Sequence, residues 1–87
     1  MTILVIARTP DPHRQAEALR AALGLTLRGA RVEVVVTAPL ATPLAHRAAE
    51  TLRSFGHVVT QVELAAEGPD DGFGDALGRA DRVEVWT

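Results

Sequence analysis

The sequence contains no cysteine, no lysine and no tyrosine, and Ser54 is its only serine. Covalent catalysis through a thiol or a Schiff base is therefore excluded, because these reactions need a cysteine or a lysine. The hydroxyl nucleophiles that remain are Ser54 and the threonines. Disulfides are excluded as well, which is compatible with a reducing compartment.

Long hydrophobic runs and strong charge are also missing. The apolar opening, residues 1–7, is short and follows no positive charge, so we expect no signal peptide. No stretch reaches the roughly 20 apolar residues of a membrane span. The net charge of −2 is too small and of the wrong sign for nucleic-acid binding. We therefore expect a cytoplasmic protein that binds neither membranes nor nucleic acid.

The composition favours one small folded domain that covers residues 1–87. Hydrophobic residues make up 47% of the chain, which excludes disorder. A chain of this length buries only about 60–65% of the surface that its unfolded form exposes. Self-association would extend so small a core.

Four segments have the pattern of strands. Residues 3–7 form a continuous apolar run, which is typical of a strand buried on both faces, and we place it at the centre of the sheet. Residues 32–36 and 58–64 are the second and third strands. Residues 82–86 alternate polar and apolar side chains and predict a half-exposed edge strand.

Two helices are marked by the same signals, an N-cap residue followed by proline and, at the other end, a glycine. The first begins at Asp11-Pro12 and ends at Gly29; the second begins at Thr42-Pro43 and ends at Gly56. A weaker helix is expected over 73–79, after a loop at 65–72. The predicted apolar faces are Ala16, Leu19, Ala22, Leu23 and Leu27 in the first helix and Ala45, Ala48, Ala49, Leu52 and Phe55 in the second.

This alternation of strands and helices predicts an α/β fold. Strands joined by crossovers of this length run parallel, through right-handed connections. We expect a small open parallel sheet of about four strands with helices on both faces.

Ligands of such sheets bind beyond the carboxyl ends of the strands. The residues expected at that rim and able to hold a small anion are Arg8, Thr9, His13 and Thr37. The alternative is that Asp11 only caps the helix and that Arg8 and His13 are solvated. No glycine lies between the first strand and the helix, which argues against a dinucleotide-binding fingerprint or a phosphate-binding P-loop.

Two other pairs of polar residues are weaker candidates for a metal or catalytic site. His46 and Glu50 are four residues apart on the polar face of a helix, and the adjacent Asp70 and Asp71 lie in a predicted turn. No further ligand accompanies either pair, so we expect no metal site and no cofactor. An acid–base enzyme built on Asp11 and His13 is a third hypothesis, and we favour a protein that is not an enzyme.

Large apolar residues near the end of the chain point to an interface. Trp86 lies on the predicted edge strand, where it either packs on the last helix or anchors a partner, and Phe73 is the other candidate contact.

Four stretches, residues 3–12, 18–29, 32–36 and 80–86, resemble the DsrE/DsrF-like family of small sulfur-relay proteins, which is related to TusD. The resemblance implies a parallel α/β sheet like that of DsrE proteins or of one half of a flavodoxin-like fold. It also implies assembly into trimers, hexamers or hetero-hexamers. Some members carry a persulfide on a cysteine just after the third strand. The corresponding residues here, 62–66, contain no thiol.

The resemblance therefore implies a relative without its own persulfide carrier. Our leading hypothesis is a non-catalytic DsrE-like protein that acts as an oligomeric, accessory or binding subunit, paired with itself or with a related DsrE-like subunit. The alternative is a module that binds a small molecule or anion through the first strand–helix loop.

Overall fold

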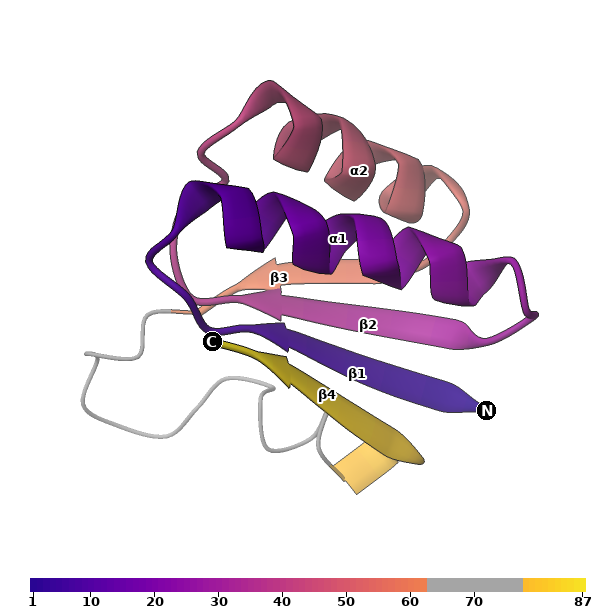
Figure 1. The fold of residues 1–87 in the computed structure, drawn as a ribbon. Coiled ribbons are helices and arrows are strands. Elements are labelled where there is room, and N and C mark those ends of the chain that lie inside the picture. Colours follow the sequence, from indigo (N-terminus) through magenta and orange to yellow (C-terminus); the bar gives the residue numbers. More distant parts are fainter. Residues whose placement is uncertain (63–77) are drawn as a thin grey trace.

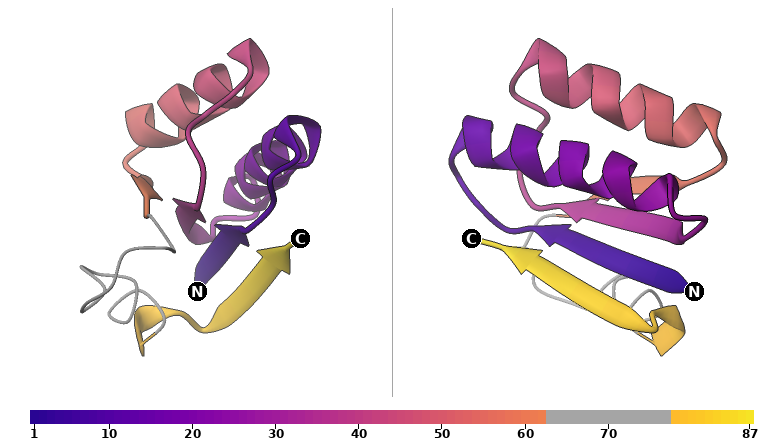
Figure 2. Two further views of the ribbon diagram at one scale, coloured as in Figure 1. Left: turned by 90° about the vertical axis from the view of Figure 1, so that its left-hand side faces the viewer. Right: turned by 45° about the vertical axis from the view of Figure 1, so that its right-hand side comes forward.

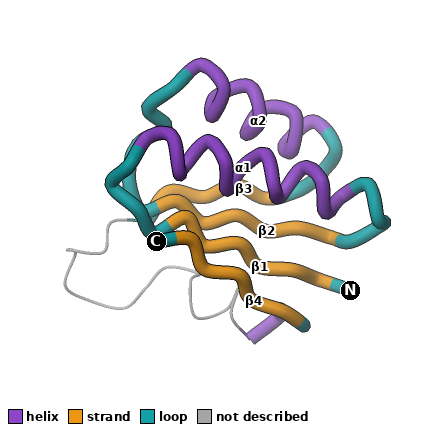
Figure 3. The backbone as a smooth tube through the Cα atoms, in the orientation of Figure 1, coloured by secondary structure: helices purple, strands orange, loops and turns teal. Residues whose placement is uncertain are grey.

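The computed structural model describes residues 1–62 and 78–87 of the chain. These residues form four strands and two helices (Figure 1): β1 (Thr2–Ala7), α1 (Pro12–Thr26), β2 (Arg31–Val36), α2 (Pro43–Ser54), β3 (Val58–Gln61) and β4 (Arg82–Trp86). All neighbouring strands are parallel, in the order β3-β2-β1-β4 (Figure 3). The predicted α/β class and the small open parallel sheet are confirmed.

Strand β1 lies at the centre of the structure, as its apolar sequence predicts. It pairs with β2 along one side and with β4 along the other. Side chains of successive residues point to opposite faces of a strand, and both Leu4 and Val5 are fully buried. Both faces of β1 are therefore covered.

Helices α1 and α2 pack side by side on one face of the sheet (Figure 2). The larger core lies between these helices and the sheet. It contains Ile3, Val5, Ala7, Ala16, Ala18, Leu19, Ala22, Val32, Val34, Val36, Ala45, Ala48, Ala49, Leu52 and Val59. A smaller core on the opposite face contains Leu4, Ile6 and Val35, with Val62 and Ala80 packed against it.

The direction in which successive strands are added to the sheet reverses next to β1; we call the position between β1 and β4 the reversal. The chain moves from β1 outward to β2 and β3, then crosses to the other side of β1 to form β4. In a flavodoxin-like order, β3 would instead lie beside β1, so this order differs from that part of the expectation. The reversal lies between β1 and β4, where open α/β sheets bind ligands.

The predicted helix signals are confirmed at both helices. The Asp11 carboxylate accepts the N–H of His13 at the start of α1, and the Thr42 hydroxyl accepts the N–H of Ala45 at the start of α2. Each cap residue is followed by proline at the first helical position. Gly29 and Gly56 follow the helices with φ of 81° and 85°, a conformation that favours glycine.

Two predicted core residues are wrong. Leu27 is 89% exposed because α1 ends at Thr26, and Phe55 is 69% exposed because it is the C-cap of α2. Each residue continues the apolar spacing of its helix but lies one position beyond the last helical residue. We expected helices on both faces of the sheet, and the two described helices, α1 and α2, share one face (Figure 2). Residues 63–64 of the predicted third strand and 73–77 of the predicted third helix lie outside the described residues, and 78–79 are helical.

Two polar contacts join the segment before β4 to the neighbouring strands β1 and β2. The N–H of Thr2 donates to the Asp81 carboxylate and the N–H of Asp81 donates to the carbonyl of Thr2, both at 2.8 Å. This reciprocal pair sets the start of β4 against β1. On the face opposite α1 and α2, Glu33 is buried and accepts two hydrogen bonds from the guanidinium of Arg79, at 3.0 and 3.2 Å.

Among the described residues, no helix has both the length and the apolar character needed to cross a membrane.

We predict that Leu19→Ala lowers the free energy of unfolding by about 2–5 kcal/mol, because it leaves a cavity under α1. Urea unfolding followed by circular dichroism measures this change. Leu27→Ala makes the same substitution on the same chain segment at an exposed site and should change stability by less than about 0.5 kcal/mol. Equal losses in the two variants would contradict the packing described here.

Candidate functional site

The carboxyl ends of the parallel strands gather at one rim of the sheet. Arg8 follows β1, Thr37 follows β2, and Trp86 is the last residue of β4. The N-terminus of α1 and the C-terminus of the chain both lie at this rim (Figure 1). The structure thus brings the loops that follow β1 and β2 to one edge, as expected from parallel strands. The predicted loop at 65–72 lies outside the described residues.

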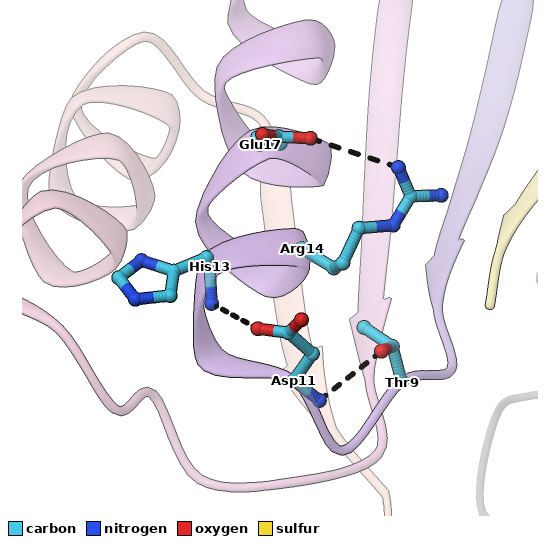
Figure 4. Close-up of polar contacts among 5 residues, drawn as sticks. All are labelled: Thr9, Asp11, His13, Arg14 and Glu17. Atoms are coloured by element: carbon cyan, nitrogen blue, oxygen red, sulfur yellow. Dashed lines mark hydrogen bonds and ion pairs between the residues drawn. The ribbon is translucent and has the colours of Figure 1, made fainter.

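A short chain of hydrogen bonds organises the loop between β1 and α1 (Figure 4). The buried hydroxyl of Thr9 accepts the N–H of Asp11 at 3.1 Å, and the Asp11 carboxylate accepts the N–H of His13 at 2.8 Å. The carboxylate therefore occupies the position at the helix N-terminus where an anion would bind. Thr9 and Asp11 shape the loop.

The hypothesis of an acid–base pair needs a contact between the Asp11 carboxylate and the His13 imidazole. Asp11 instead receives the backbone N–H of His13, and the imidazole points away from it (Figure 4). His13 and Arg14 point to opposite sides of the first turn of α1. The arrangement gives Asp11 the role of a helix cap.

A cationic and aromatic pair lies at the reversal between β1 and β4. The guanidinium carbon of Arg14 is 5.0 Å from the centre of the Trp86 ring, within the range of a cation–π contact. Trp86 is half-buried and packs against the larger core. The N–H of Arg8 donates to the carbonyl of Trp86 at 2.8 Å, so the backbone of Arg8 adjoins the end of β4. The Arg8 side chain is exposed.

Thr37 and Gln15 hold the second rim loop in place. Thr37 donates both its N–H and its hydroxyl to the carbonyl of Ala7, each at 3.3 Å. The buried amide of Gln15 donates to the carbonyls of Ala38 and Pro39 and accepts the N–H of Ala41, at 3.0–3.1 Å. Three hydrogen bonds from one side chain thus tie α1 to the loop before α2.

Gln15 is not among the residues predicted for this rim. The residue stands between His13-Arg14 and Ala16, where a polar side chain fits the exposed face of a helix as well as the buried one. Its partners are backbone groups of a loop more than 20 residues away. The sequence signal is helical spacing, because Gln15 lies four residues before Leu19 and seven before Ala22, on the apolar face of the helix.

The four predicted ligand-binding residues therefore have different surroundings. Thr9 and Thr37 use their hydroxyls within the scaffold, whereas Arg8 and His13 are exposed. Of the two predicted interface residues, Trp86 lies at the rim and Phe73 lies outside the described residues.

The remaining histidines do not gather into a metal centre. Within residues 1–62 and 78–87, no group of three or more His, Asp or Glu side chains is placed to hold a metal ion. His46 and Glu50 are both exposed on α2. His57 accepts the N–H of Val32 at 3.2 Å through Nδ1, a contact that joins the start of β3 to β2.

No protein-family model, no curated protein and no solved structure matches this chain. The resemblance to DsrE-like proteins thus stays an expectation from the sequence.

We predict that Gln15→Glu loosens the loop at 38–41. The carboxylate would face the carbonyl oxygens of Ala38 and Pro39 and would lose both donated hydrogen bonds, at a cost of about 1–3 kcal/mol. Urea unfolding measures the loss.

The matched control is Gln61→Glu, which adds the same charge at an exposed glutamine. It should leave the free energy of unfolding near that of the wild-type protein. An unchanged free energy of unfolding in Gln15→Glu would show that the two donated hydrogen bonds do not hold this loop.

Proposed function

We propose that this chain is a non-catalytic α/β protein that works as an oligomer, as an accessory or binding subunit of the DsrE-like kind. The observation that carries the proposal is the edge strand β4, which ends the sheet and exposes Val83 and Val85. An edge strand with exposed apolar side chains is suited to pairing with another chain.

The rim of the sheet gives the proposal further support. Several polar groups there that could act on a ligand are already used in the scaffold: the Thr9 hydroxyl, the Asp11 carboxylate, the Gln15 amide and the Thr37 hydroxyl. Buried polar groups are normally paired in this way to maintain the fold. These residues therefore favour a structural use of the rim over a catalytic one.

A sulfur-carrying role does not fit the chain on its own. A persulfide forms on a cysteine thiol, and the sequence has none. Any part in sulfur transfer would come from association with a subunit that supplies the thiol.

We predict that the protein sediments at micromolar concentration with a mass of two or more times 9.2 kDa, the mass of one chain. Association is expected because a small core gains buried apolar surface when copies join. Sedimentation equilibrium over a series of concentrations measures the mass. A 9.2 kDa species across the whole series would contradict the proposal.

A second candidate function is binding of a small anion at the reversal between β1 and β4. The observation in its favour is the exposed Arg8 beside the Arg14–Trp86 pair, at the place where such sheets bind ligands. The Arg14 guanidinium also contacts the Glu17 carboxylate at 3.7 Å (Figure 4), so the exposed guanidinium of Arg8 is the group offered to an anion.

A thermal-shift series with inorganic phosphate, citrate and ATP tests this second function. A ligand at 100 times its dissociation constant should stabilise the fold by about 2.7 kcal/mol. Arg8→Ala should remove the shift and Arg20→Ala, at an exposed site within α1, should keep it. Absence of any shift with all three compounds would count against anion binding.

A further inference from the structure

We propose that two copies of this chain join through their β4 strands, antiparallel across a two-fold axis, and so form one continuous eight-stranded sheet. The inference rests on the proposed oligomeric function and names the surface and the partner. Four observations carry it: the direction of the β4 backbone, the blocked edge at β3, the exposed valines and the order of charges along β4.

The backbone of β4 offers hydrogen-bonding groups on its outer side. The carbonyl of Trp86 accepts the N–H of Arg8, so the backbone of Trp86 faces β1. Backbone groups alternate in direction along a strand, and those of Val83 and Val85 therefore face away from β1. A second strand can bond to them without disturbing the pairing of β4 with β1.

The other edge of the sheet is closed by a side chain. Val62 donates its N–H to the carbonyl of Val36, so by the same alternation the carbonyl of Val59 faces away from β2. The guanidinium of Arg53 donates to that carbonyl at 3.0 Å. A cationic side chain over an edge strand opposes pairing with another chain. In the part of the chain that the structure describes, no side chain is bonded to the outer groups of β4 in this way.

The outer face of β4 carries an apolar patch. Val83 is 42% exposed and Val85 is 54% exposed, and both side chains lie on the face opposite α1. In an antiparallel β4 pair centred on Val83, this residue meets Val83 of the second copy across the axis, and Val85 lies opposite Asp81 of that copy. β-branched residues pack well on such a shared face.

The charges on β4 are complementary to those of a second copy in one register. Arg82 and Glu84 share the other face of the strand and form an ion pair at 2.9 Å within the chain. If Val83 lies opposite Val83 of the second copy, Arg82 lies opposite Glu84 of that copy, twice per dimer. If the axis passes through Glu84 instead, two carboxylates face each other, which is unfavourable. Among the registers centred on a β4 residue, only the one centred on Val83 places opposite charges against each other, so the charges favour that register.

Disulfide trapping tests both the interface and the register, because the chain has no cysteine of its own. In the proposed register, the Cα atoms of the two Val83 residues are about 5.5 Å apart, within the range of a disulfide. The two Val85 residues are separated by four residues along the strand, about 14 Å. Val83→Cys should therefore give a covalent dimer under mild oxidation, and Val85→Cys should stay mostly uncrosslinked although Val85 is the more exposed residue.

A charge-exchange experiment tests the same contact without cysteine. Arg82→Glu and Glu84→Arg each place like charges opposite one another in a homodimer, so each variant alone should fall from twice 9.2 kDa to 9.2 kDa in sedimentation. Mixed in equal amounts, they should form a heterodimer, because every opposed pair is then attractive. Circular dichroism of each variant confirms that it is folded.

The outcomes separate this proposal from the oligomeric function on which it rests. A wild-type protein that is monomeric overturns both. An oligomeric wild type in which neither cysteine variant crosslinks overturns the β4 interface and leaves the oligomeric function standing. Crosslinking at 85 alone overturns the register centred on Val83. Equal crosslinking at positions 83 and 85, or a mixture of charge variants that stays monomeric, overturns the proposed pairing. Crosslinking at 83 alone together with recovery in the mixture supports it.

Discussion

The pairing of β1 on both sides, together with its burial on both faces, is the constraint on which the structure depends. Its residues contribute alternately to the core under α1 and α2 and to the smaller core opposite. Its neighbours β2 and β4 run parallel to it, so these strands end at one rim. The position of every rim residue, from Thr9 to Trp86, follows from this strand.

Much of this fold could be predicted from local sequence signals. The run Ile3–Ala7 is too apolar for any strand with an exposed face. The caps Asp11 and Thr42, each followed by proline, fix the start of both helices because each combines a side-chain acceptor with a residue that has no N–H to satisfy. These signals act over a few residues and so can be interpreted without knowing the tertiary structure.

What could not be predicted depends on contacts between distant segments. The role of Gln15 comes from a loop that begins 23 residues later, and the position of β4 beside β1 comes from a crossover. Leu27 and Phe55 match the helical spacing but lie beyond the last helical residue, where the backbone no longer directs a side chain to the core. At the candidate site, the sequence could place Thr9 and Thr37 after strands but could not show that their hydroxyls bond to the backbone.

The two edges of the sheet show how one chain can both prevent and permit pairing. At β3, Arg53 satisfies an outward carbonyl, and Thr60 and Gln61 are exposed polar residues. At β4, Arg82 and Glu84 lie on one face of the strand, and Val83 and Val85 lie on the other. Such a strand disfavours unrelated strands, because burying its charges without partners is costly. In the proposed dimer, a strand of the same sequence running in the opposite direction supplies those partners, so the charges that protect the edge would also select its own copy.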